Sequence, residues 1–293
     1  MTPYIFILLS AIFFCIGIII DNFLTNKKFK DTKSLLFYSN ITNLLFIPLL
    51  WIFGLPKALP INLIIPLTIV AIAQTIYLYP YFQALKELDT SIVGALFNFG
   101  KIFTPIMAYI VIDERLSLMQ YIGFATIIFG AFMMTYQGKL NLNKGFFYMI
   151  LTTIILSVSA TTTKYSLEHI DWITVMTWTA IISTVLNFII GTLFYRKEIL
   201  SSKKTYFSTI WQFIINEFVT FLAMACLIYA VTNIQVTISQ GILATAPIFM
   251  IVFAFFGHKI FPNYFKENIE WKHVIRKVFY ILIICIGVIM SVM

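Results

Sequence analysis

Two charged side chains of opposite sign stand near the middle of apolar runs in this sequence. Lys101 lies in the run 97–116, FNFGKIFTPIMAYIVIDERL, and Glu217 lies in the run 207–231. An ionised side chain at the centre of a bilayer costs on the order of 3 kcal/mol on insertion scales, so it needs a partner or a function. An ammonium and a carboxylate at one depth are suited to binding the two ends of a zwitterion.

Three interpretations of this pair stay open at the level of the sequence. In the first, the two side chains form a buried ion pair that holds two parts of the protein together. In the second, Lys101 binds the carboxylate or phosphate of a substrate, while Glu217 binds its amino group or carries a coupling proton. In the third, the two side chains never meet, and each is satisfied by its own neighbours.

Helical spacing places Lys101 on a small and polar face. That face carries Ser91, Gly94, Asn98, Lys101, Pro105 and Ala108. It is expected to border protein or a wet cavity, which makes Asn98 a candidate substrate-binding residue. Gln74, Tyr77 and Gln240 are further candidates inside other apolar runs, although small and polar residues at such spacings also serve helix packing.

Composition sets the elements that must position these residues. Of 293 residues, 60% are hydrophobic and 11% are charged, whereas soluble domains carry about 25% charged residues. Apolar runs of about 18 or more residues are long enough to cross the hydrocarbon layer of a bilayer. We therefore expect an all-α integral membrane protein, with the lipid bilayer as its surroundings. Ten candidate transmembrane helices cover 4–24, 34–54, 62–85, 91–112, 117–136, 145–166, 172–195, 207–230, 236–257 and 273–292.

Ten spans divide into two repeats of five. The segment ALKELDTSIVGAL (84–96) aligns with AVTNIQVTISQGI (230–242), half a chain further on. Because five is odd, the second repeat must enter the membrane from the opposite side, which gives two inverted five-helix repeats with a site at the midplane between them. The expected domains are 1–139 and 140–293. Lys101 and Glu217 belong to opposite halves and would meet at that site.

Basic residues are distributed unevenly among the connectors. Sixteen of the 20 Lys and Arg residues follow odd-numbered spans, three (Lys57, Arg115 and Lys164) lie on the other side, and Lys101 stands apart. By the positive-inside rule, connectors after odd-numbered spans are cytoplasmic and both termini face outward. The net charge of +8 therefore reflects topology, and no nucleic-acid partner is expected. We expect a multi-pass protein of a bacterial inner membrane, present as a monomer or a homodimer.

Three further residues carry local expectations. Asp21 lies at the end of the first span, where the helix dipole disfavours a carboxylate, so we expect Lys27 or Lys28 beside it. Lys164, near the end of the sixth span, is expected to extend its ammonium to the membrane interface. Pro80 is expected to kink or loosen the third span.

A short motif gives a family resemblance. Residues 110–134, IVIDERLSLMQYIGFATIIFGAFMM, hold the pattern Glu114, Arg115, Leu116, Gln120, Gly123 and Gly130. This pattern resembles the junction of the fourth and fifth helices in the EamA family of the drug/metabolite transporter superfamily. The resemblance implies ten helices in two halves and secondary transport of small metabolites. The second half is more divergent, because 257–265 holds no clear copy of the motif. Family members are usually described with both termini in the cytoplasm, which conflicts with the charge distribution here.

These observations favour a secondary active transporter that moves a small polar metabolite by alternating access, with proton coupling or exchange left open. An amino acid or related zwitterion suits Lys101 together with Glu217. The alternative is a multidrug or organic-cation exporter, which would use Glu217 with aromatic side chains such as Tyr77. A channel is disfavoured, because the sequence shows no ring of charged residues and no loop that resembles a selectivity filter. An enzyme is disfavoured, since the three histidines fall at connectors without metal-binding spacing and no cysteine pair has CxxC spacing. We expect no cofactor and no metal.

Overall fold

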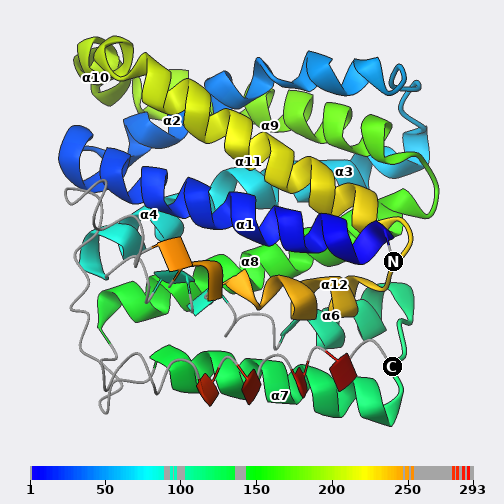
Figure 1. Ribbon diagram of the computed structural model, residues 1–293. Coiled ribbons are helices and arrows are strands. Elements are labelled where there is room, and N and C mark those ends of the chain that lie inside the picture. The colour runs from blue at the N-terminus through cyan, green and yellow to red at the C-terminus, as the bar shows by residue number, and fades with distance from the viewer. Residues whose placement is uncertain are drawn as a thin grey trace.

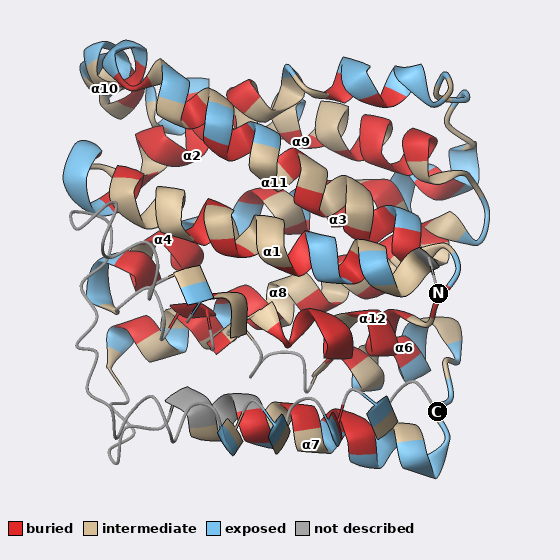
Figure 2. Cartoon of the chain, viewed as in Figure 1, coloured by how far each residue is buried: buried red, intermediate tan, exposed pale blue. Residues whose placement is uncertain are grey.

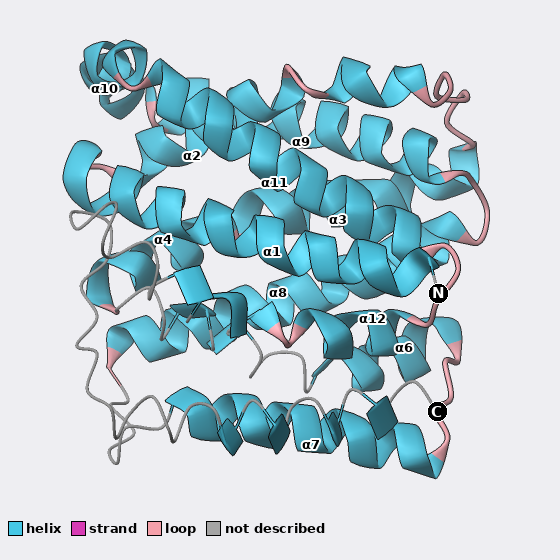
Figure 3. Cartoon of the chain, viewed as in Figure 1, coloured by secondary structure: helices cyan, strands magenta, loops and turns pink. Residues whose placement is uncertain are grey.

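The structure is a computed structural model, and it is a bundle of helices that run side by side (Figure 1). It describes residues 2–88, 93–94, 96–97, 103–135, 143–246, 248–250, 252–253, 279–280, 282–283, 286–287 and 289–290. Within those residues the chain forms helices and loops and no strand (Figure 3). The prediction of an all-α membrane protein is confirmed.

Eleven α-helices have described bounds within those ranges. They are α1 (Thr2–Phe23), α2 (Thr32–Leu44), α3 (Ile64–Ile76), α4 (Leu78–Glu87), α6 (Phe103–Ile112), α7 (Leu118–Thr135), α8 (Lys144–Leu167), α9 (Trp172–Phe194), α10 (Arg196–Ser208), α11 (Ile210–Val231) and α12 (Val236–Leu243). A π-helical turn covers Leu24–Lys28, and 3-10 turns cover Ile47–Ile52 and Ile61–Leu63.

Six helical stretches of the described chain are long and apolar enough to cross a membrane. They are Pro3–Lys28, Thr32–Ile52, Ile61–Glu87, Lys144–Leu167, Trp172–Phe194 and Ile210–Val231. Each coincides with a predicted span, and shorter apolar helices occupy three more. Most of the tenth span, 273–292, lies outside the described residues. Large apolar side chains such as Ile65 and Trp211 are exposed, as expected of surfaces that face lipid.

Local sequence explains where several helices begin. Asp31, Asn143 and Asp171 each accept a hydrogen bond from a backbone N–H in the first turn of α2, α8 and α9 respectively, over 2.9 to 3.0 Å. Side-chain oxygens at this position satisfy donors that have no partner within the helix. The polar connectors between spans therefore also fix the helix starts.

Two of the predicted spans are broken rather than continuous. The third span is interrupted at Tyr77, which separates α3 from α4. Pro80 causes this break, because it has no N–H to donate to the carbonyl of Ile76, and the expected distortion is confirmed. In the second span, α2 ends at Leu44 and a 3-10 turn that contains Pro48 continues it. Both breaks lie beside the central cavity described below.

Basic connectors meet at one end of the bundle. The ammonium of Lys86 donates to the backbone oxygen of Lys30 over 3.1 Å, and Lys33 pairs with Glu198 of α10 over 3.2 Å. Connectors that follow different odd-numbered spans therefore lie together, as the charge distribution requires. Which side of the membrane this end faces stays a prediction.

The Lys164 ammonium binds backbone oxygens of the protein instead of extending to the membrane interface. Its ammonium donates to the backbone oxygens of Val231, over 2.9 Å, and Ile234, over 3.3 Å. Val231 is the last residue of α11, where the helix dipole favours a cation, and Ile234 lies in the connector to α12. The expectation of simple extension to the interface is replaced by a cap that ties α8 to α11.

Glu114, the acidic residue of the family-like motif, joins the two halves of the chain. Its carboxylate oxygens accept the backbone N–H groups of Val236, over 2.9 Å, and Thr237, over 3.0 Å. These are the first two residues of α12, whose N–H groups have no partner within the helix. A negative charge at a helix N-terminus is also favoured by the helix dipole.

We predict that Glu114→Ala lowers the free energy of unfolding by about 1–2 kcal/mol, because two backbone donors of α12 lose their charged acceptor. Thermal unfolding of the purified protein in detergent measures this effect. Arg115→Gln is the matched control, since the Arg115 side chain pairs with Asp113 at the exposed surface and such pairs contribute little. Equal destabilisation by both changes would contradict the assigned role of Glu114.

Candidate functional site

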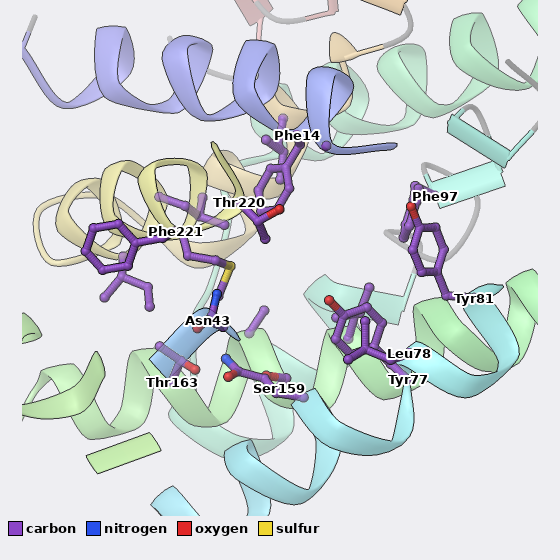
Figure 4. Close-up of a pocket in the computed structure, with 18 of the residues that line it drawn as sticks. Phe14, Asn43, Tyr77, Leu78, Tyr81, Phe97, Ser159, Thr163, Thr220 and Phe221 are labelled. Atoms are coloured by element: carbon purple, nitrogen blue, oxygen red, sulfur yellow. The ribbon is translucent and has the colours of Figure 1, made fainter. Parts of the chain in front are cut away.

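A cavity of about 280 Å³ lies inside the bundle. Its walls come from α1, α2, the α3–α4 break, α8, α9, α11 and α12. Figure 4 shows labelled side chains from several of these helices around a common central space. The volume is at the lower end of the range for small-molecule pockets, which is about 300–1,000 Å³.

Glu217 reaches this cavity from α11 and is held by α2. It is buried, with 4% of its surface exposed. The hydroxyl of Ser39 donates to one carboxylate oxygen, and the side-chain amide of Asn43 donates to the other over 3.2 Å. Ser39 and Asn43 lie one turn apart on α2, so both side chains point from the same face. This pair of donors offsets part of the cost of burying a carboxylate.

Asp21 supplies a second carboxylate to the same cavity. The hydroxyl of Tyr81 donates to one of its oxygens over 2.9 Å, and the side-chain amide of Asn216 donates to the other over 2.8 Å. The expectation that Lys27 or Lys28 would pair with Asp21 is wrong. The π-helical turn carries those lysines beyond α1, and Asp21 is satisfied from across the bundle instead.

Asn216 occupies a key position between the two carboxylates. It precedes Glu217 in α11, is 2% exposed and donates to Asp21. Its Oδ1 atom accepts no hydrogen bond from the described residues. The assigned role of Asn216 is therefore the hydrogen bond that it donates to Asp21.

Aromatic side chains form part of the cavity wall. The rings of Tyr77 and Tyr81 have centroids 6.4 Å apart, and those of Tyr81 and Phe97 are 5.5 Å apart. Figure 4 shows these three rings on one side of the space, with Phe221 and Asn43 across from them. Tyr77 lies at the break between α3 and α4 and lines the cavity.

The two charged side chains among the described lining residues are both acidic. They are Asp21 and Glu217, and no lysine or arginine lines the described wall. Carboxylates and the faces of tyrosine rings are groups that commonly bind cations in proteins. No group of three or more His, Cys, Asp or Glu side chains within the described chain is placed to hold a metal; His258, His273 and Cys285 lie outside it.

Four of the predicted site residues lie together in this cavity: Glu217, Gln74, Tyr77 and Gln240. Their roles in binding stay predictions. Lys101 and Asn98 lie outside the described residues, so the pairing of Lys101 with Glu217 also stays a prediction.

Sequence reasoning missed Asp21 as a member of the site, and it gave Asn216 and Ser39 no role. A signal for Asp21 was present, because a carboxylate within a long apolar run is costly and therefore marks a functional candidate.

Comparisons with known proteins agree with this membrane fold. A sequence model described as the EamA-like transporter family matches residues 1–136 and 143–293. An "Uncharacterized transporter" of Methanothermobacter thermautotrophicus (strain Delta H) is 25% identical over 140 residues, which are 45% of this chain and 39% of that protein. This chain therefore spans well under half the length of that relative. A protein of known crystal structure has a similar fold, with a TM-score of 0.66 at 12% identity over 97% of this chain and 98% of that one.

We predict that Asn216→Ala lowers the free energy of unfolding by about 1–3 kcal/mol, because Asp21 loses a charge-assisted donor inside the bundle. Thermal unfolding in detergent measures the loss. Asn40→Ala is the control, since Asn40 also lines the cavity but its amide donates only to Leu36 of its own helix. If the two variants are equally stable, the contact between Asn216 and Asp21 does not hold α1 against α11.

Proposed function

Since the chain belongs to the EamA-like transporter family, we propose that it is a secondary active transporter whose central cavity binds a small solute through an ammonium group. The observation that carries this proposal is the pair of carboxylates, Asp21 and Glu217, that face one cavity with aromatic walls. Alternating access around a fixed central site is the expected mode of transport.

An ammonium group suits the acceptors that are present. Each carboxylate already accepts two hydrogen bonds, but a carboxylate offers about four acceptor positions. A primary ammonium has three N–H donors, which suit the acceptor positions that remain on the two carboxylates of this wall. Tyr77 and Tyr81 present ring faces that favour a cation.

Two substrate classes share this chemistry. An amino acid or related zwitterion carries a carboxylate as well, for which Lys101 is the partner that the sequence supplies. An organic cation needs no such partner and would use the acidic and aromatic wall alone. The acidic character of the described wall favours binding of the ammonium end in both cases. Whether Lys101 binds a substrate carboxylate distinguishes the two classes.

The same two carboxylates provide a way to couple the movement of substrate to the movement of protons. When a cationic group leaves the cavity, two acidic side chains remain on its buried wall with no cation among the described lining residues, which favours uptake of a proton by one of them. Exchange of substrate for a proton, or of one substrate for another, would then keep the charge inside the bundle balanced. Basic connectors on the cytoplasmic side of a bacterial inner membrane complete the proposed arrangement.

We predict that Glu217→Gln and Asp21→Asn each reduce transport at least tenfold, because a neutral amide cannot balance a bound cation. Counterflow of radiolabelled amino acids and amines in proteoliposomes measures this, and counterflow itself distinguishes a carrier from a channel. Glu198→Gln is the matched control, since Glu198 pairs with Lys33 outside the cavity. Full transport by both cavity variants would exclude the proposed binding mode.

The role of Lys101 is tested by Lys101→Gln. If the substrate is a zwitterion, this change weakens its apparent affinity roughly tenfold or more, because a charge-assisted contact to a carboxylate contributes about 1.5–3 kcal/mol. The amine that lacks the carboxylate should be unaffected and serves as the control. Unchanged affinity for both solutes shows that Lys101 does not touch the substrate, and transport of the amine alone identifies an organic-cation carrier.

A further inference from the structure

Helix α10 differs from its neighbours in direction. The spanning helices run across Figure 1, whereas α10 is seen nearly end-on at one end of the bundle. Its sequence, RKEILSSKKTYFS, has 13 residues, which corresponds to about 20 Å and is too short and too polar to cross a bilayer. Because α10 connects α9 to α11, it lies across the bundle at the level where two spans leave the membrane.

The inner face of α10 is anchored to α2. Ile199 and Tyr206 are buried. The ring of Tyr206 stacks on that of Tyr38 with centroids 4.2 Å apart, and its hydroxyl lies 2.9 Å from that of Thr42. Tyr38 also donates from its hydroxyl to the backbone oxygen of Ile199 over 2.9 Å. The helix is therefore fixed in its orientation, and its opposite face must point away from the bundle.

The outer face of α10 combines apolar and basic side chains. Leu200 and Phe207 are each 60% exposed and lie together at the centre of this face. Helical spacing puts Arg196 and Lys203 on one side of them and Lys197 and Lys204 on the other, all four exposed. Figure 2 shows this exposed side of the helix. The one acidic residue of α10, Glu198, pairs with Lys33 instead.

We propose that this outer face of α10 is a binding site for anionic phospholipids. An apolar centre flanked by lysine and arginine is typical of helices that lie in the membrane interface. Leu200 and Phe207 enter the upper part of the acyl chains, and the four cations extend along the surface to the phosphodiester headgroups. The same end of the bundle also carries Lys27, Lys28 and Lys30. These lysines add positive charge there, but they do not belong to an amphipathic helix.

The lipid site is connected to the cavity through the contacts of α2. Tyr38 and Thr42 of α2 hold α10, and the residues that follow each of them, Ser39 and Asn43, donate to Glu217. Headgroup binding that fixes α10 therefore also supports the part of α2 that holds Glu217. The binding proposal itself does not depend on the transport function.

The test is a titration of the full-length protein in neutral detergent with phosphatidylglycerol, followed by thermal unfolding. We expect phosphatidylglycerol to raise the unfolding temperature, while phosphatidylcholine of the same chain length and inorganic phosphate do not. Replacing Lys197, Lys203 and Lys204 together by Gln should weaken the apparent affinity on the order of 100-fold, because each basic residue contributes about fivefold at an anionic surface. Replacing Lys27, Lys28 and Lys30 by Gln removes equal charge from the same end and should leave most of the effect.

Equal losses in the two triple variants would overturn the proposal, because the effect would then belong to the charge of this end rather than to α10. An equal rise with phosphatidylcholine or with inorganic phosphate would also overturn it. If the α10 triple variant does not fold, the wild-type protein still decides the matter. In about 1 M salt the Debye length falls to about 3 Å, so a phosphatidylglycerol effect that persists undiminished contradicts binding through headgroup charge.

Discussion

Two carboxylates inside a membrane bundle impose the constraint on which this structure depends. A buried charge is tolerated only when hydrogen bonds or an opposite charge stabilise it. Two consecutive residues of α11 take part in the hydrogen bonds that stabilise these carboxylates. Asn216 donates to Asp21 of α1, and Glu217 accepts hydrogen bonds from two side chains of α2. Tyr81 of α4 completes the set. Four helices are therefore held around one polar space by the need to satisfy two acidic groups.

Hydropathy alone predicted the spans well, because crossing a hydrocarbon layer requires long apolar helices. It also brought Glu217, Gln74, Tyr77 and Gln240 forward as candidates, since polar groups within such helices are costly. The contact between Asp21 and Asn216 joins residues 195 positions apart, and no local pattern indicates such a partner. Helix α10 was missed for a related reason: its residues are too polar for a span, and its amphipathic character matters only once its anchors on α2 are known.

Helix α2 links the two environments of the protein. Tyr38 and Thr42 contact α10 at the basic end of the bundle, whereas Ser39 and Asn43 turn toward the cavity and Glu217. The same short helix thus carries adjacent residues that serve the membrane surface and the proposed substrate site. Its end at Leu44 and the break at Tyr77 both lie beside the cavity, whose wall includes Asn43, Ile47 and Tyr77. Interruptions of this kind are tolerated in membranes where the freed backbone borders protein or a cavity.

The central claim is that an ammonium group binds between Asp21 and Glu217. The most direct measurement is a crystal structure of the protein with a brominated amine, located by anomalous diffraction. The account predicts a bromine peak in the central cavity and an ammonium nitrogen about 2.7–3.2 Å from an oxygen of Asp21 or Glu217. A bound amine whose nitrogen contacts neither carboxylate, or a peak outside the bundle interior, would contradict it.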